Sequence, residues 1–169
     1  DLDLGHYERF IDINATEGSS VSTGKIYGEV IAKERKGDFL GTTIQIIPHI
    51  TDAIKDRIKN MAKKSDADIV IVEIGGTVGD LENLWFLEAA RELAAEVDQK
   101  DILFVHLGLL PVIDLQGQQK TKPMQQSLLF LRERGLIPRV LIGRSKERLT
   151  EKTKERIGFA CNVPKANVF

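Results

Sequence analysis

Val70-Ile71-Val72-Glu73-Ile74-Gly75-Gly76-Thr77-Val78-Gly79-Asp80-Leu81-Glu82 is the stretch that decides the fold prediction. It begins as an apolar run, which is typical of a strand buried on both faces, and we expect that strand over residues 69–74. In an open α/β sheet, ligands bind just beyond the carboxyl ends of the strands. Carboxylates placed there on a glycine-rich backbone suit Mg²⁺ and a nucleotide. The sequence contains no Gly-x-x-x-x-Gly-Lys-Ser/Thr loop, so the predicted phosphate site lacks that cradle.

The rest of the chain alternates between expected strands and helices. Helical spacing and end signals predict helices over residues 22–36, 49–63, 83–97 and 150–161, and between Pro123 and Gly135. Short apolar or β-branched runs predict further strands over residues 43–47, 102–110 and 140–142. Because such an alternation needs crossover connections, we expect an α/β fold with a mostly parallel sheet and helices on both faces. One domain spanning residues 1–169 is expected.

Composition limits the possible classes of function. The chain has 169 residues, of which 42% are hydrophobic and 29% charged, values that are ordinary for a globular protein. The net charge of −1 gives no argument for nucleic acid or for a membrane surface, and no apolar run reaches membrane-spanning length. Cys161 is the only cysteine, so an internal disulfide is excluded and a cytoplasmic location is expected. The abrupt ends suggest part of a longer protein.

Glu73 and the acids after it have two interpretations each. A charge at the end of a buried strand is costly unless it is paired, hydrogen-bonded or bound to a metal, so a basic partner and a magnesium ion explain Glu73 about equally well. The glycines favour the ligand site because they let a bulky anion approach the backbone, although a purely structural bend is the alternative. Asp80 and Glu82 stand where a helix is expected to begin, and an acid there also caps a helix.

A second candidate site is Lys120-Thr121-Lys122-Pro123 with Gln125. Two lysines flank a hydroxyl just before a helix whose amino end exposes unpaired N–H groups, a combination that favours phosphate. The alternative is a solvated basic loop, part of a polar segment that also contains Asp114, Gln116 and Gln119. The segment Asp1 to Phe10 fits either an edge strand or a further source of metal carboxylates. Cys161 is predicted to be a core residue.

Taken together, these segments resemble the amidoligase (synthetase) domain of the CTP synthase family. The matching stretches, in chain order, are Asp1-Leu2-Asp3-Leu4-Gly5-His6-Tyr7-Glu8-Arg9-Phe10, Thr23-Gly24-Lys25-Ile26-Tyr27, residues 33–41, Gln45-Ile46-Ile47-Pro48-His49-Ile50-Thr51, residues 73–82, Lys120-Thr121-Lys122-Pro123 and Cys161-Asn162-Val163-Pro164. They span essentially the whole chain. The resemblance implies a fold of the P-loop NTPase and dethiobiotin-synthetase type, incomplete at both ends.

The resemblance also implies a reaction, a ligase reaction of pyrimidine biosynthesis. Enzymes of this family use ATP to phosphorylate the 4-oxygen of UTP, and ammonia then displaces the phosphate to give CTP. The ammonia comes from glutamine through a separate glutaminase domain, as in other glutamine amidotransferases, and CTP acts as an inhibitor. Mg²⁺ and ATP are the implied cofactor and co-substrate, and a homotetramer, a dimer of dimers, is the implied assembly.

Individual residues acquire roles from the same resemblance. Asp3 and Glu73 are implied to be the magnesium ligands and, with Lys120, the catalytic residues. Asp80, Leu81 and Glu82 are implied to line the pyrimidine nucleotide site, and the nucleotide and its phosphates are implied to contact Lys120, Thr121, Lys122 and Gln125. Arg156 stands where the family usually has a lysine for the triphosphate, which keeps the charge but changes the geometry. Met124 stands where a threonine is common.

The resemblance leaves several parts of the enzyme outside this chain. We expect the phosphate-binding loop with its catalytic lysine to precede residue 1, and the adenine-contacting segment and glutaminase domain to follow Phe169. The isolated chain is therefore expected to be inactive. One alternative is a non-catalytic module that binds pyrimidine nucleotides or mediates assembly. Another is a related phosphate-activating ligase such as a dethiobiotin synthetase, against which the Asp1 to Phe10 and Lys120 to Pro123 segments argue.

Overall fold

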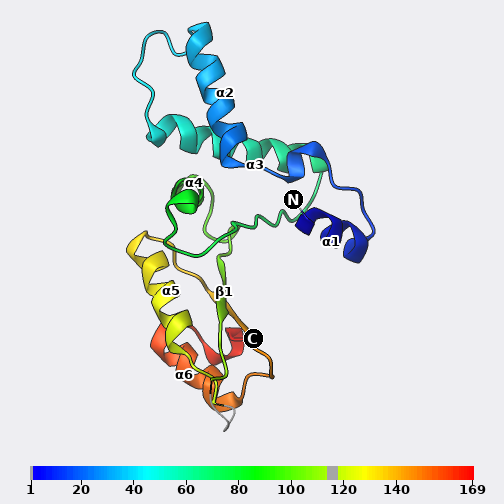
Figure 1. The fold of residues 1–169 in the computed structure, drawn as a ribbon, viewed down its shortest axis with the longest axis vertical. Coiled ribbons are helices and arrows are strands. Elements are labelled where there is room, and N and C mark those ends of the chain that lie inside the picture. The colour runs from blue at the N-terminus through cyan, green and yellow to red at the C-terminus, as the bar shows by residue number, and fades with distance from the viewer. Residues whose placement is uncertain (1, 114–117) are drawn as a thin grey trace. The chain divides into compact units, whose positions relative to one another are not determined.

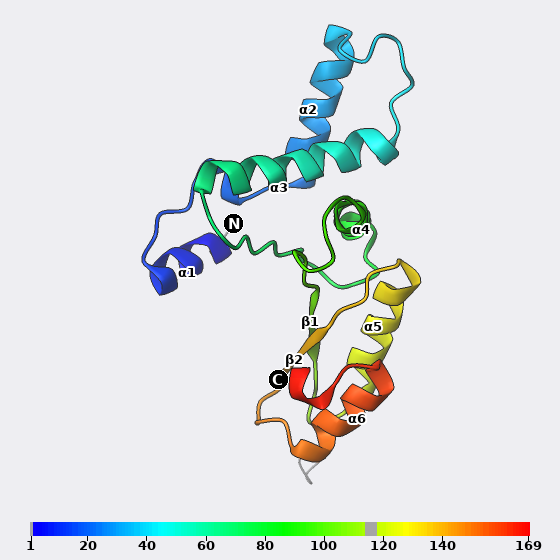
Figure 2. The same ribbon diagram turned by 180° about the vertical axis from the view of Figure 1, so that it is seen from behind.

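The structure is a computed structural model that describes residues 2–113 and 118–169. Two compact units divide the chain: unit 1 contains Asp1–Gly75 and Leu84–Ala90, and unit 2 contains Gly76–Asn83 and Arg91–Phe169. Within the described residues, the α-helices are α1 (Leu2–Ile11), α2 (Thr23–Lys36), α3 (Thr51–Ser65), α4 (Leu84–Glu96), α5 (Lys122–Glu133) and α6 (Glu151–Cys161) (Figure 1). The strands are β1 (Val105–Leu109) and β2 (Val140–Arg144) (Figure 2).

Short helical turns complete the list, at Glu17–Ser19, Ile46–Ile50, Leu81–Asn83 and Lys165–Asn167. Among the described helices, none combines the length and the apolar character that a membrane crossing requires. The five helices that the sequence predicted are confirmed as α2 to α6, with ends that differ by at most two residues. The single-domain assignment stays a prediction.

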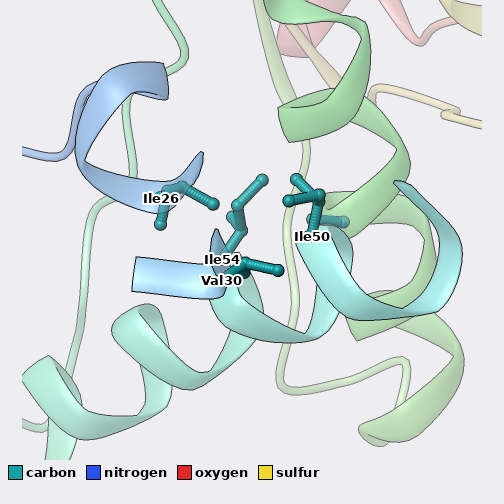
Figure 3. Packing of buried hydrophobic residues seen from close by; sticks show 5 residues of the cluster. Ile26, Val30, Ile50 and Ile54 are labelled. Atoms are coloured by element: carbon teal, nitrogen blue, oxygen red, sulfur yellow. The ribbon is translucent and has the colours of Figure 1, made fainter. Parts of the chain in front are cut away.

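Unit 1 is built around the packing of α2 and α3. Ser22 caps α2 by accepting a hydrogen bond from the Lys25 N–H at 3.3 Å, and Gly37 ends the helix in the left-handed conformation with φ of 84°. The core of the unit is formed by Ile26, Val30, Ile50, Ile54 and Ala89 (Figure 3). Trp85 and Phe86 at the start of α4 pack against this cluster. The apolar residues that recur at helical spacing along α2 and α3 therefore form the core of this unit.

Two strands predicted in unit 1 are wrong. Residues 42–45 are irregular, and Ile46–Ile50 forms a wide helical turn in which the Thr51 N–H bonds to the carbonyls of Ile46 and Pro48. The backbone there closes on itself instead of on a neighbouring strand. Residues 69–74 are irregular, and all of them except the half-buried Ile74 are exposed, with Ile69 at 80% and Ile71 at 90% exposure. No strand among the described residues pairs with them, and a strand needs such a partner for its backbone groups.

The amino-terminal segment is also helical, so the edge strand suggested for Asp1 to Phe10 is wrong. The alternation of acid and apolar residues covers only the first four positions, and the helix α1 already begins at Leu2. His6 and Arg9 lie one turn apart on this helix, with His6 Nδ1 and Arg9 Nη2 3.0 Å apart. The Glu8 carboxylate then accepts the Ala15 N–H at 2.7 Å, beyond the end of the helix.

Unit 2 contains a small parallel sheet covered by helices. β1 and β2 pair in parallel from Val105 with Val140 to Leu109 with Arg144, and one further parallel bridge joins Leu141 to Val168. α5 packs against β1, and α6 against α5 (Figures 1 and 2). Burial alternates along β1, with His106 inside and Leu107 exposed, so this strand is not buried on both faces as predicted.

The fold class is therefore confirmed at a coarse level only. The protein is a mixed α/β chain whose described strands are parallel, as the crossover spacing required. The described sheet has two strands, so the larger sheet with helices on both faces is not present among these residues. The sequence showed apolar runs at residues 43–47 and 69–74, but only pairing makes such runs into strands.

Candidate nucleotide and magnesium site

The glycine-rich bend of unit 2 is held together by its own side chains. Gly76 and Gly79 adopt φ of 86° and 106°, a backbone conformation that side chains disfavour. Asp80 Oδ2 accepts the Thr77 N–H at 3.1 Å, and the Asn83 amide donates to the Thr77 carbonyl at 2.9 Å. The Asp80 carboxylate thus fixes the bend, a structural role different from the predicted helix cap. The next two predicted nucleotide contacts, Leu81 and Glu82, are exposed.

The lysine-rich segment of unit 2 begins α5, as predicted. The Lys120 N–H donates to the Pro111 carbonyl at 2.9 Å, which fixes the backbone just before the helix. Thr121 is buried at the helix start, and its hydroxyl accepts from Gln125 Nε2 at 3.0 Å. Lys120 Nζ donates to Gln118 Oε1 at 2.6 Å, and Lys122 is exposed. Two lysines thus stand at an amino end where helical N–H groups are available to an anion.

The two remaining residues singled out in this region take different positions. Arg156 is exposed on α6, where its guanidinium is accessible to a ligand. Met124 is completely buried and packs against β1, where a Cβ added to Gly108 would lie 2.7 Å from Met124 Cγ. The methionine at this position is therefore a core residue of unit 2. Cys161 is 1% exposed, which confirms the core prediction, and burial raises the pKa of its thiol.

The two predicted magnesium ligands belong to unit 1. Asp3 lies in the first turn of α1, and Glu73 lies in the exposed segment before the bend. Because water solvates Glu73, the argument from a charge at the end of a buried strand is wrong. The metal role of both residues stays a prediction. Among residues 2–113 and 118–169, no three His, Cys, Asp or Glu side chains gather where they would hold a metal ion.

Two buried polar residues of unit 2 were missed by the sequence reading. Gln119 is 8% exposed and forms hydrogen bonds to the loop that precedes α6. His106 on β1 is 4% exposed, and burial lowers its pKa below the usual value. Glutamine in a polar loop gives no sequence signal of burial, and a lone histidine in an apolar run gives only a weak one. Asp114 and Gln116, which were grouped with this loop, lie outside the described residues.

Comparison with known proteins gives one consistent family. The model of the family "CTP synthase N-terminus" matches residues 1–169. The chain is 56% identical over 164 residues to CTP synthase from Methanosarcina acetivorans, covering 97% of the chain and 30% of the relative. It is 52% identical over 165 residues to CTP synthase from Carboxydothermus hydrogenoformans, covering 98% and 31%. For CTP synthase from Clostridium perfringens, strain SM101, the identity is 50% over 168 residues, covering 99% and 31%.

The chain thus spans about 30% of the length of these curated relatives. The match is continuous across both units and includes the glycine-rich bend, the lysine segment and the two carboxylates discussed above. Over its whole length, the chain belongs to the CTP synthase N-terminal family.

Proposed function

We propose that this chain supplies the UTP-binding and magnesium-binding part of a CTP synthase. The observation that carries the proposal is the family match over all 169 residues, at 50–56% identity to the relatives described above. The lysine segment at the amino end of α5 supports it, because its cations and N–H groups suit a triphosphate. Since the chain spans about 30% of its relatives, the complete reaction belongs to the proposal as well.

The proposed reaction has two steps. ATP transfers its γ-phosphoryl group to the 4-oxygen of UTP, and ADP leaves. Ammonia, supplied from glutamine by a glutaminase domain, then attacks carbon 4, and phosphate leaves as CTP forms and a proton is lost. CTP binds the same pyrimidine site as an inhibitor, and the working assembly is a homotetramer. The isolated chain is not expected to catalyse the reaction.

The residues of unit 2 have the role of binding and orienting the nucleotide. Lys120 and Lys122 place positive charge beside the amino end of α5, where Thr121 and Gln125 already hold each other in place. Lysine charge stabilises the negative charge that spreads over phosphoryl oxygens during transfer. Arg156 adds a further cation to the triphosphate, and the bend around Asp80 borders the pyrimidine.

Asp3 and Glu73 suit magnesium by their chemistry. Both present exposed carboxylate oxygens, the hard donors that Mg²⁺ prefers, and magnesium sites commonly use only one or two carboxylates together with waters and substrate phosphates. When bound, magnesium neutralises part of the charge on the phosphates. The role of the two carboxylates in the proposal is to bind this ion.

The proposal is tested on the complete gene product with UTP, ATP and ammonium chloride, by chromatographic detection of CTP. We expect CTP to form only when all three are present, and ATP hydrolysis to depend on UTP. Glu73→Ala should abolish turnover without changing thermal unfolding, because Glu73 is exposed and packs in no core. Glu133→Ala, at an exposed position at the end of α5, is the matched control and should keep full activity.

Three results would contradict parts of the proposal. Absence of UTP-dependent ATP hydrolysis in the wild-type protein would remove the enzyme function and favour a non-catalytic module. Retained turnover in Glu73→Ala would remove Glu73 from the metal site. If Glu133→Ala lost as much turnover as Glu73→Ala, the assay would be responding to the removal of any carboxylate.

A further inference from the structure

Gln119 is a buried amide that joins two segments distant in the sequence. Its Nε2 donates toward Ser145 Oγ at 3.4 Å and toward the carbonyls of Glu147 and Arg148 at 3.3 and 3.2 Å. Its Oε1 accepts the Thr150 N–H at 3.4 Å. One carboxamide therefore uses both its donor and its acceptor to hold the loop that follows β2. A carboxamide can do this because it carries two N–H donors and a carbonyl acceptor and stays uncharged at neutral pH.

The two segments that Gln119 joins lead into the two helices of the proposed nucleotide site. Gln119 directly precedes Lys120, and its own backbone is fixed by a bridge to Val112. Thr150 is the amino-terminal cap of α6, where its hydroxyl accepts the Thr153 N–H at 3.1 Å. The amide thus connects the amino end of α5 to the amino end of α6, the helix that carries Arg156.

The loop held by Gln119 also carries cations of its own. Lys146 and Arg148 are exposed on it. They line an open pocket of about 580 Å³ together with Lys154 and with the two acids Glu147 and Glu151. The four hydrogen bonds measure 3.2–3.4 Å, at or beyond the long end of the usual range, so each is individually weak. Their combined effect is to select one conformation of the loop that leads into α6, which lowers the entropic cost of ordering this loop when a ligand binds.

We propose that Gln119 is a positioning residue that fixes Lys120 and Lys122 relative to α6 and Arg156, so that these cations grip one triphosphate. This role rests on the proposed function, because it assumes UTP as the ligand. Gln119 acts through other residues and touches no substrate itself. It was not among the residues that the sequence or the family resemblance pointed to.

The first test needs no nucleotide. In the complete gene product, Gln119→Leu removes donor and acceptor but keeps most of the volume, and Gln126→Leu, at an exposed position of α5, is the matched control. Lys146 and Arg148 are trypsin sites inside the held loop. We expect Gln119→Leu to increase the initial rate of cleavage there by about threefold or more, because the loop opens more often. Gln126→Leu should match the wild type.

The second test measures UTP and ATP kinetics in the same variants. Gln119→Leu should raise the KM for UTP by about threefold to tenfold, the size expected for one ordinary hydrogen bond, with a smaller change in kcat. In Gln119→Glu the KM for UTP should be raised more at about pH 8 than in Gln119→Leu, and it should fall back toward the wild-type value at about pH 6. The reason is that only the protonated carboxyl can donate to the carbonyls of Glu147 and Arg148. A role limited to folding would not produce this pH-dependent recovery.

Each outcome decides the proposal. Unchanged cleavage in Gln119→Leu overturns the coupling, whether or not UTP binds. Faster cleavage with an unchanged KM overturns the positioning role alone, while absence of UTP binding in the wild type overturns the proposed function and with it the nucleotide part of this role. If Gln119→Leu does not fold, Gln119→Asn replaces it, because the shorter side chain of asparagine cannot reach all four partners. The rate of tryptic cleavage and the KM for UTP should then both rise. An unchanged cleavage rate and an unchanged KM overturn the proposal.

Discussion

The contact between β1 and α5 gives a prediction whose size can be worked out from the structure. Gly108 lies on the inner side of β1, and Met124 covers it from α5. A Cβ added at Gly108 would lie 2.7 Å from Met124 Cγ and 3.2 Å from both Met124 Cβ and Cε. Carbon atoms in good contact are about 3.5–4.0 Å apart. Gly108→Ala therefore requires the helix and the strand to separate or the methionine to leave its position.

The expected cost follows from the known penalties of overpacking. Adding a methyl group to a packed core costs about 1–3 kcal/mol, and the lower backbone entropy of alanine in the unfolded chain offsets about 0.5–1 kcal/mol of this. We therefore expect a net loss of about 1–2 kcal/mol. Met124→Ala alone should cost about 2–5 kcal/mol because it leaves a cavity. In that background Gly108→Ala should be close to neutral, since the clash is gone and the methyl fills part of the space.

The measurement must report on unit 2. The single tryptophan, Trp85, packs in the core of unit 1 and is the wrong probe. Amide hydrogen exchange of peptides from β1 and α5, read by mass spectrometry, reports on the right elements. A decrease of about 1.4 kcal/mol in the free energy of opening corresponds to about tenfold faster amide exchange, provided that the opened segment closes faster than its amides exchange. The double-mutant cycle should give a coupling of about 1–2 kcal/mol, the difference between the cost of Gly108→Ala with and without the Met124 side chain.

Gly28→Ala is the matched control for this experiment. Gly28 is exposed inside α2, and a Cβ added there meets no atom of the described structure within 4 Å. Alanine is the better helix former, so this change should stabilise α2 by about 0.5–1 kcal/mol. The reasoning is refuted if Gly108→Ala leaves exchange in β1 and α5 unchanged, or if its cost is the same with and without the Met124 side chain.

Two further predictions concern a pH dependence and a helix cap. Burial lowers the pKa of His106, so the unfolded chain binds the proton before the folded chain does as the pH falls. Unit 2 therefore keeps its full stability above about pH 6.5, and below this pH its free energy of unfolding falls by up to about 1.4 kcal/mol per pH unit. Amide hydrogen exchange of β1 should report this pH dependence of stability, and His106→Leu should remove it. An unaltered pH dependence in the variant would show that other groups cause it. Ser22→Ala should destabilise α2 by about 0.5–2 kcal/mol, whereas Ser22→Asp keeps a capping side chain. Unfolding is followed by the fluorescence of Trp85, which packs against the core of unit 1. Equal unfolding midpoints for the two variants would contradict the capping role.

The sequence predicted the helices well because their signals are local. The hydrogen bonds of a helix join residues four apart, and its caps lie at its own ends. Ser22 and Gly37 around α2, and Thr150 before α6, could all be read without knowing any other part of the chain. The same locality explains why the lysine segment was correctly placed at the start of a helix.

Of the four predicted strands, those over residues 102–110 and 140–142 are confirmed as β1 and β2, and the other two are wrong. The apolar runs at residues 43–47 and 69–74 look like those of β1 and β2, but the structure describes partners only for β1 and β2. A strand satisfies its backbone groups on residues far away in the sequence, so its existence depends on what lies beside it. The argument that Glu73 is a buried charge was wrong because it depended on such a strand.

In the candidate site, too, some features follow from local sequence and others depend on long-range contacts. The sequence by itself determined the family, the helix ends and the residue types suited to phosphate and magnesium, because these are properties of local stretches. Only the tertiary structure decided that Met124 is a core residue against Gly108, that Asp80 fixes its own bend, and that Gln119 is buried. Gln119 bonds to partners 26–31 residues away, and contacts over such distances arise only when packing brings the segments together.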